Sequence, residues 1–531
     1  FNGDNNNIHI RAIFKNSKDD IWIATFGNGL FRLQYNDPNI TRYQAPQIIE
    51  NRIYAISEDS QGRMWFGMDT KGMQIFEYGK GFYLLTHDPA DPQSISGNAI
   101  EKILLANNGD VWVGTTRTGL NQHKLVTENF THLKNRTNTS MKLLSNDVIS
   151  IGVDGDQRLW IGTFGEGWAI LDIQKQQMNY ITAENGLVGN HPKDIVIGNN
   201  GFIWLCSEVG ITKVNAMTLQ VIETYISNNS GFTGGQITSA IDDNKGNLWL
   251  GHFGGGFSKF TKADSSFTLY NTTNSQLPSD TIDKLLLSTS GDIWIATRSG
   301  LVLYSPLNDT FSHYPKHNDG RNYYFNDITL DIDGSMWIAS PKGVHRFNTS
   351  TMLYEKNTAI VNEPTYKLLT DLNGFSWLST NNGLLRLDTN NEPSMRLTHN
   401  DGVQAGEFYG GVGIVMSDGT LAFGGTDGAT IFHPNSVNPQ QNKVNIAQIS
   451  IQSNSGSHTN ILNNMPDNLN LPASSLGLTL SLSSLNFDTV NKIKYRYQQE
   501  QGKWISAQGN KIYIPANKSG DFSYRIASTN T

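Results

Sequence analysis

The sequence is poor in groups that would cross-link it, anchor it in a membrane or bind nucleic acid. It has one cysteine, Cys206, among 531 residues, so no disulfide forms within the chain, and its apolar neighbours predict a buried thiol. No apolar run approaches the roughly 20 residues of a membrane-spanning helix, so this chain by itself is not expected to contact a membrane. Acidic residues number 47 against 40 basic ones, with no basic stripe, which argues against a nucleic-acid partner.

The sequence also lacks the motifs of common catalytic sites. It contains no G-x-S-x-G, no H-E-x-x-H, no Walker loop and no cysteine cluster. Its 12 histidines are scattered, and no pair of carboxylates recurs at a suggestive spacing. We therefore expect no metal, no cofactor and no enzymatic activity in this chain.

One phrase, by contrast, recurs along most of the chain. It reads "DIWIATFGNGL" from Asp20 and returns as "DVWVGTTRTGL" from Asp110 and "NLWLGHFGGGF" from Asn247. Its aromatic slot falls at residues 22, 65, 112, 160, 204, 249, 294, 337, 377 and 423, with tryptophan at all but the last, where Phe423 stands. The gaps run from 40 to 48 residues, a period typical of β-propeller blades.

Each repeat predicts one sheet of four short antiparallel strands. In the second copy, residues 53–57 alternate as a strand, and "RMWFGM", "MQIFEY" and "FYLL" predict three more, separated by turns. One such sheet cannot bury both of its faces alone, so it must pack against the next blade. We expect the tryptophans between blades, where the small Gly, Ala or Ser beside them lets the next sheet approach.

The repeats predict more than one ring, because ten blades exceed the usual roughly four to eight. We expect residues 145–436 to close a seven-bladed propeller and residues 1–144 to form three blades of an incomplete N-terminal propeller. A single ring of ten blades is the alternative. After a polar linker, short alternating strands over residues 443–531 predict an immunoglobulin-like β-sandwich, with Tyr495, Tyr497, Tyr513 and Tyr524 in its core.

Three features resemble a known family. They are the blade phrase, the transition "GEFYGGVGIVMSDGTLAFGGTDGATIFHPNSV" over residues 406–437, and the closing segment from Lys492, which resembles a triple-tyrosine domain. Together they make the chain similar to the periplasmic sensor regions of two-component regulator propeller proteins. The chain departs from that family in showing ten blades rather than fourteen, and it lacks every cytoplasmic part.

The resemblance implies a periplasmic location and a role in signal transduction. In that family, two seven-bladed rings and the sandwich precede a transmembrane helix and a cytoplasmic histidine kinase or diguanylate cyclase. It further implies a small-molecule ligand, often an oligosaccharide, and a homodimer in the full-length protein.

Candidate ligand-binding residues lie in the turns after the second strand of each blade, which open on one face of a propeller. Turns favour Gly, Asn and Asp for backbone reasons, so other residue types there are the better candidates. We select Arg117, Phe164, Glu166, His252 and Arg298. Weaker candidates in the same turns are Phe26, Asn28, Asp69, Lys71, Glu208, Lys342, Asn381 and Asp427.

Three functions from different classes fit this sequence. The first is a non-enzymatic sensor region that binds a ligand and passes the signal on through the sandwich. The second is a propeller enzyme resembling streptogramin lyases, which would need His and Glu clustered around a divalent metal. The third is a protein-interaction scaffold.

Overall fold

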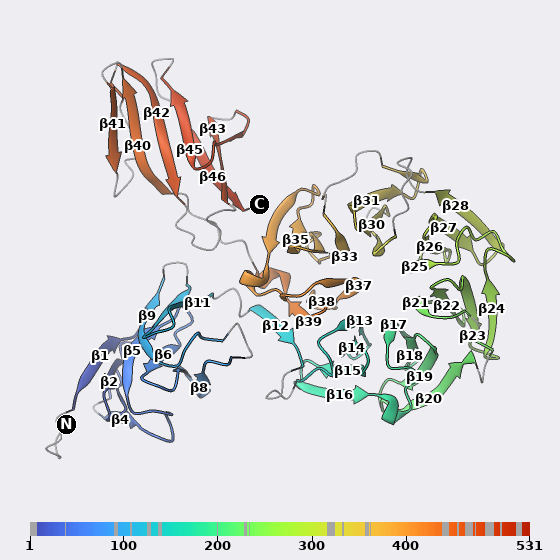
Figure 1. Cartoon of the computed structure of the whole chain (residues 1–531), viewed down its shortest axis with the longest axis horizontal. Coiled ribbons are helices and arrows are strands. Elements are labelled where there is room, and N and C mark those ends of the chain that lie inside the picture. The colour runs from blue at the N-terminus through green and yellow to red at the C-terminus, as the bar shows by residue number, and fades with distance from the viewer. Residues whose placement is uncertain are drawn as a thin grey trace. The chain divides into compact units, whose positions relative to one another are not determined.

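The computed structural model describes residues 8–37, 39–89, 94–106, 109–124, 129–135, 141–198, 200–227, 231–232, 234–315, 324–331, 334–355, 361, 363–437, 445–453, 456–461, 471–472, 474–483, 493–499, 502–516 and 523–530. The prediction of an all-β chain is confirmed, because the architecture consists of small antiparallel sheets (Figure 1). The chain divides into two compact units, Phe1–Asn129 and Phe130–Thr531.

The first unit contains three blades whose inner strands β1, β5 and β9 pack in series. The first blade consists of β1 (Ile10–Lys15), β2 (Ile21–Thr25), β3 (Leu30–Leu33) and β4 (Ile40–Tyr43). The second consists of β5 (Ile53–Glu58), β6 (Met64–Met68), β7 (Met73–Glu77) and β8 (Gly81–Leu85). In the described residues, the third consists of β9 (Ile100–Leu105), β10 (Val111–Thr115) and β11 (Leu120–His123).

The second unit contains a ring of seven four-stranded sheets, which we number as ring blades 1 to 7 (Figure 1). Blade 1 consists of β13 (Val148–Val153), β14 (Leu159–Thr163), β15 (Gly167–Asp172) and β16 (Gln177–Ile181). Blade 2 consists of β17 (Pro192–Ile197), β18 (Phe202–Ser207), β19 (Gly210–Asn215) and β20 (Val221–Ile226). Blade 3 consists of β21 (Ile237–Asp242), β22 (Asn247–His252), β23 (Phe257–Thr261) and β24 (Ser266–Tyr270). Blade 4 consists of β25 (Ile282–Leu287), β26 (Ile293–Thr297), β27 (Gly300–Ser305) and β28 (Thr310–Pro315). Blade 5 consists of β29 (Asp327–Leu330), β30 (Met336–Ser340), β31 (Gly343–Asn348) and β32 (Leu353–Tyr354). Blade 6 consists of β33 (Thr365–Thr370), β34 (Ser376–Thr380), β35 (Gly383–Leu387) and β36 (Pro393–Leu397). Blade 7 is β37 (Phe408–Val415), β38 (Leu421–Gly425), β39 (Gly428–Phe432) and, from the other end of the ring, β12 (Phe130–Leu133).

The ring closes on itself. Its inner strands contact one another in the order β13, β17, β21, β25, β29, β33 and β37, and β37 contacts β13. The ten repeats therefore do not share one ring. The ring begins at Phe130 rather than at residue 145, because β12 supplies the outer strand of blade 7 and pairs with β39. The repeat phrase marks only second strands, so it gives no sign of a lone outer strand.

The tryptophans of the repeats pack between blades, as predicted. Trp249 of blade 3 lies in one buried cluster with Ile282, Leu285 and Ile295 of blade 4. This packing also requires the glycine two residues after Trp249, because a Cβ on Gly251 would lie 2.6 Å from the Cγ2 atom of Ile282. Eight of the nine repeat tryptophans are buried, and Trp112, in the last blade of the first unit, is partly exposed.

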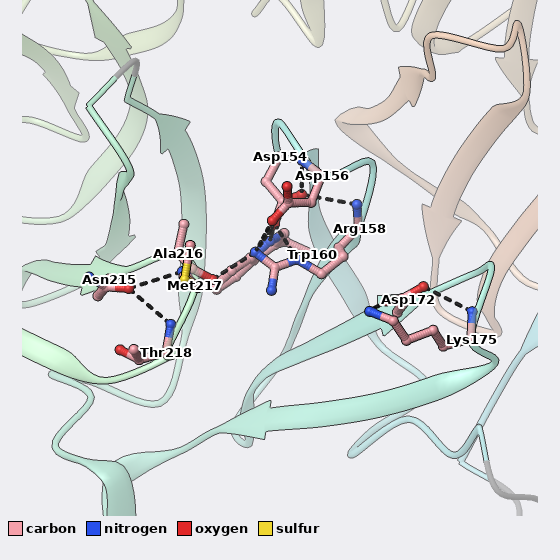
Figure 2. A network of polar contacts seen from close by, with 10 residues as sticks. All are labelled: Asp154, Asp156, Arg158, Trp160, Asp172, Lys175, Asn215, Ala216, Met217 and Thr218. Carbon is pink, nitrogen blue, oxygen red and sulfur yellow. Dashed lines mark hydrogen bonds and ion pairs between the residues drawn. The ribbon is translucent and has the colours of Figure 1, made fainter.

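An aspartate six residues before the tryptophan fixes the preceding turn (Figure 2). Asp154 accepts hydrogen bonds from the backbone N–H groups of Asp156 and Arg158, both at 3.0 Å, and from Nε1 of Trp160 at 2.7 Å. The guanidinium of Arg158 donates at 2.7 Å to the carbonyl of Ala216 in the next blade. The indole bond recurs at Asp59, Asp243, Asp331 and Asp371.

The last repeat differs from its predicted alignment. Ala422 occupies the tryptophan slot, because it lies opposite Ile414 and Ile431 as Trp65 lies opposite Ser57 and Ile75. Phe423 stands one position later. Its aromatic character suggests the slot, but the pairing of the strands fixes the register.

The C-terminal residues form two sheets that share one core, which confirms the predicted sandwich. One sheet contains β40 (Asn445–Ser453), β41 (Gly456–Ile461), β42 (Ser475–Ser483) and β45 (Lys511–Pro515); the other contains β43 (Ile493–Gln499), β44 (Ile505–Ser506) and β46 (Tyr524–Asn530). Tyr495 is buried, and Tyr497 packs against the core. Tyr513 was wrongly assigned to the core: it is 48% exposed, because the alternate residue Ile512 faces inward. Three short 3-10 helices, η2 (Ala183–Asn185), η3 (His399–Asp401) and η4 (Pro434–Ser436), are described in the ring and just after it.

Candidate ligand-binding face

The turns after the second strands of the ring blades lie beside the links that enter the inner strands. The N–H of Phe164 donates to the carbonyl of Asp147 at 2.9 Å, and the N–H of Phe253 donates to the carbonyl of Gln236 at 2.9 Å. Each bond joins the end of a second strand to the start of the inner strand of the same blade. We call the side of the ring that carries these turns and links the turn face.

Among the inner strands of the ring, β13, β17, β21, β25 and β33 share an irregularity at their turn-face end. In β25, Ile282 lies opposite Thr297 and Lys284 lies opposite Ala296, so Asp283 has no residue opposite it. Such a β-bulge bends the strand and redirects a side chain. The residues at this position are Ile149, Lys193, Thr238, Asp283 and Tyr366.

Blades 1 and 2 contribute an aromatic pair with charged neighbours. The ring of Phe164, 49% exposed, stacks on His191 with centroids 4.3 Å apart and planes at 30°. His191 is held in place by Glu208, whose two carboxylate oxygens contact its Nδ1 atom at 3.1 Å and its backbone N–H at 3.2 Å. Burial lowers the pKa of Lys193, and the nearby Glu208 carboxylate offsets part of this shift. The pair thus offers an aromatic surface bordered by hydrogen-bonding groups.

Blades 3 to 5 contribute a second group around Arg298. Its Nε atom donates to Asp283 at 3.0 Å, and its guanidinium lies 5.1 Å from the ring centre of Tyr324 and 6.0 Å from that of Phe253. Phe253 is 57% exposed and Tyr324 is 46% exposed. The other Asp283 oxygen accepts from the backbone N–H of Phe325 at 3.0 Å, so the carboxylate that orients Arg298 is itself fixed.

Two tyrosines continue this group through blades 6 and 7 toward blade 1. The hydroxyl of Tyr366 donates to Oδ1 of Asn381, and the hydroxyl of Tyr409 donates to Asp147 at 3.2 Å. Burial raises the pKa of Tyr366, and the Glu407 carboxylate raises it further. Burial, Asp147 and Glu407 raise the pKa of Tyr409 in the same way. Both phenols are therefore neutral hydrogen-bonding groups near neutral pH.

Charged residues that follow the bulge positions along the inner strands form ion pairs. Asp194 accepts from Ser239 at 3.0 Å and lies 3.3 Å from Nζ of Lys284. Burial lowers the pKa of Lys284, but the carboxylates of Asp194 and Asp327 outweigh it, so the pKa is raised and the ammonium keeps its charge. Lys367 pairs with Asp327 at 3.0 Å. These ion pairs join blades across the interior of the ring.

Of the five selected residues, the structure places Phe164 and Arg298 in these groups. Of the weaker candidates, it places Glu208 and Asn381 there. Glu166 is exposed on the same turn as Phe164. Arg117 is exposed in the first unit, outside the ring. His252 is 0% exposed, and its ring nitrogens contact Ser258 Oγ at 2.7 Å and the Gly235 carbonyl at 3.3 Å. It therefore lies in the interior and does not reach the turn face.

Several residues of the turn face escaped the sequence criterion, which considered only the turns after second strands. His191 and Tyr324 lie in links, whereas Lys193, Asp283 and Tyr366 occupy bulges within inner strands. A polar or aromatic residue in second place of an otherwise apolar inner strand is the signal that could have identified them.

The described residues were also searched for metal-binding clusters and membrane spans. They contain no group of three or more His, Cys, Asp or Glu side chains placed to hold a metal ion. None of the helices described is both long and apolar enough to cross a bilayer.

Residues 47–70 and 142–165 match the family model described as two component regulator propeller. Each segment ends in a repeat phrase, one in each compact unit. These two segments are therefore similar to two component regulator propeller repeats. Over 523 residues, the chain is 22% identical to histidine kinase P4 of Formosa agariphila; the match covers 82% of the chain and 37% of that protein. The chain thus spans little more than a third of this relative's length.

Solved structures show the same fold. The extracellular domain of the putative hybrid two component system BT3049 from B. thetaiotaomicron matches with a TM-score of 0.72 at 21% identity, covering 98% of this chain and 70% of that one. The extracellular domain of the putative one component system BT4673 from the same organism matches with a TM-score of 0.51 at 18% identity, covering 100% and 74%. The fold of this chain is therefore one that these solved structures share.

Proposed function

We propose that this chain is the extracytoplasmic, ligand-sensing region of a two-component signalling receptor. The regulator propeller repeats and the fold shared with extracellular domains of such systems support this role. In the periplasm, the ring would bind a small polar molecule, and the sandwich would pass the signal to a cytoplasmic kinase or cyclase in a homodimer. The chain itself carries out no catalysis in this proposal.

The observation that carries the ligand proposal is the set of exposed aromatic rings with fixed polar partners on the turn face. Phe164 with His191, and Phe253 with Tyr324 and Arg298, combine flat apolar surfaces with hydrogen-bonding groups. Sugars present apolar C–H faces edged by hydroxyl groups, so this combination suits an oligosaccharide. The carboxylates of Glu208 and Asp283 fix the polar groups before a ligand arrives, which limits the entropy lost on binding.

The test uses the full-length receptor in its host, with transcription or phosphorylation as the readout and a panel of oligosaccharides as inducers. Phe164→Ala and Arg298→Ala should each shift the inducer concentration for half-maximal response upward by tenfold or more. Leu307→Ala and Lys175→Ala, in turns between third and fourth strands, are the controls and should respond like wild type. Wild-type responses from both turn-face variants would remove the turn face as the sensing site.

A further inference from the structure

A separate cleft lies between ring blades 6 and 7. It has a volume of about 470 Å³ and is lined by Asn381, Asn382, Gly383, Arg396, Thr398, His399, Gln404, Ala405 and Gly406. Asn381 and Asn382 belong to the turn after β34, and Gln404 to Gly406 belong to the link into β37, so the cleft opens at the turn face. The bond from Tyr366 to Asn381 connects it to the aromatic groups described above.

Gln404 is the unusual member of this lining. It is only 4% exposed, yet its side-chain oxygen has no hydrogen-bond partner among the described residues. Its Nε2 atom donates to the Glu407 carbonyl at 3.2 Å, which fixes which end of the amide is the oxygen. A buried acceptor without a donor is rare in folded proteins because its lost hydration is not replaced. The cleft therefore contains an acceptor that a bound donor would satisfy.

The loop that carries Gln404 is held by hydrogen bonds to blade 7. The backbone N–H of Gln404 donates to Oγ1 of Thr430 at 3.1 Å, and the backbone N–H of Ala405 donates to Oδ2 of Asp427 at 3.2 Å. Asp427 is in turn paired with Lys134 at 2.7 Å. Because the loop is held by the strands of blade 7, the amide cannot readily turn away to find another donor.

The charges of the cleft cancel. The guanidinium of Arg396 pairs with Glu363, which also accepts from Nδ2 of Asn382 at 2.8 Å. Asn381 accepts from Tyr366 through Oδ1, and among the described residues nothing accepts from its Nδ2 atom. The lining thus combines the unpaired acceptor of Gln404 with the unpaired donor of Asn381 among the described residues, and Arg396 adds no unpaired formal charge.

From this pairing we propose that the cleft binds a neutral hydroxylated group, such as an uncharged sugar residue. Each hydroxyl both donates and accepts, so the several hydroxyls of one sugar unit can donate to Gln404 and accept from Asn381. A carboxylate or sulfate would accept from Asn381 but leave Gln404 without a donor, and a cation would face Arg396. This inference rests on the proposed function, and it restricts the ligand of the turn face to one with an uncharged sugar unit at blades 6 and 7.

The experiment measures binding of neutral hexose tetrasaccharides and of matched uronate tetrasaccharides to the whole chain by calorimetry. Neutral sugars should bind tighter than their uronate counterparts. Gln404→Met and Asn381→Ala should each weaken neutral binding by tenfold or more. Gln74→Met is the matched control, because Gln74 is equally buried but its oxygen accepts from Ile49 at 2.8 Å.

The outcomes separate the cleft from the proposed function. If sugars bind and Phe164→Ala weakens them while both cleft variants bind like wild type, the cleft inference fails and the sensing proposal stands. Tighter binding of uronates that Gln404→Met leaves unchanged would also overturn the cleft inference. If no sugar of either class binds, both the cleft inference and the oligosaccharide proposal fail. Asn381 is exposed, so its variant folds even if Gln404→Met does not.

Discussion

The Nε1 atom of Trp249 donates a 3.0 Å hydrogen bond to the carboxylate of Asp243, six residues earlier in the chain. The same carboxylate accepts from the backbone N–H groups of Lys245 at 2.8 Å and Asn247 at 3.0 Å. One side chain therefore fixes both the turn before β22 and the indole that packs between blades 3 and 4. Trp204 lacks such a partner: its Nε1 atom is buried and unpaired among the described residues, and Gly198 stands at the aspartate position.

This contrast isolates the contribution of the indole bond. Trp249→Phe and Trp204→Phe remove similar volumes from similarly buried sites, but only the first removes a hydrogen bond, because Nε1 of Trp204 is unpaired among the described residues. We expect Trp249→Phe to lower the free energy of unfolding by about 1–3 kcal/mol more than Trp204→Phe. Urea titrations that follow the ring transition measure both, and equal losses would contradict a role for the bond. Trp249→Ala should cost about 3–5 kcal/mol in the same assay.

A second prediction concerns the small residue that follows the tryptophan. Gly251→Ala would place a Cβ atom 2.6 Å from Ile282 of the next blade, so the two inner strands must move apart. We expect a loss of about 1–3 kcal/mol, as for other overpacked cores. Gly114 is the matched control, because its added Cβ would meet nothing closer than 3.8 Å. Gly114→Ala should leave the thermal midpoint unchanged, and a similar shift in both variants would show that strand propensity, not blade packing, sets the cost.

The sequence predicts the features that depend on local patterns and misses those that depend on contacts between distant residues. The blade count and the burial of Trp249 were predictable because each blade repeats one local pattern of strands and turns. The place of Phe130 was not, because its partner Phe432 lies about three hundred residues away and no local pattern encodes their pairing.

The candidate site shows the same limit. Phe164 and Arg298 were predictable as residues that turns do not require. Asp283 escaped notice, because a bulge becomes visible only when the strand opposite is known. His252 was misplaced because its burial depends on a glycine in the link before β21: a Cβ on Gly234 would lie 2.1 Å from its ring.

A third prediction follows from the burial of His252. Burial lowers its pKa from 6.5 to about 4, the Gly235 carbonyl opposing the shift slightly. The neutral ring fits its contacts, since Nδ1–H can donate to that carbonyl while Nε2 accepts from the Ser258 hydroxyl. Between pH 6.5 and pH 4 the unfolded chain binds a proton that the folded chain does not, so stability falls as the pH falls through this window.

The expected loss from His252 is about 2 kcal/mol on lowering the pH from 7 to 5. His252→Gln removes the titrating group but retains a donor and an acceptor, so its stability should change less over the same range. The comparison requires urea titrations of both proteins at several pH values. Parallel pH profiles for wild type and variant would show that other groups account for the dependence.

The last prediction concerns the closure of the ring. Phe130 of β12 packs on Phe432 of β39 with ring centres 5.0 Å apart, and β12 forms the outer strand of blade 7 although it precedes blade 1 in the chain. Removing this contact should weaken blade 7, which is built from both ends of the ring. Phe130→Ala should lower the free energy of unfolding by about 3–5 kcal/mol.

In Phe130→Ala, hydrogen exchange should quicken first in β12 and β39 and then in β37 and β13, the two inner strands that meet at the closure. Phe267→Ala is the control: Phe267 packs on Phe260 within blade 3, with centres 4.7 Å apart, on an outer strand that does not close the ring. Its effect on exchange should stay within blades 2 and 3, whose buried cluster it packs against. If both variants instead quicken exchange over the same blades, β12 does not act as the closing strand, and the ring opens as one unit whichever blade is weakened.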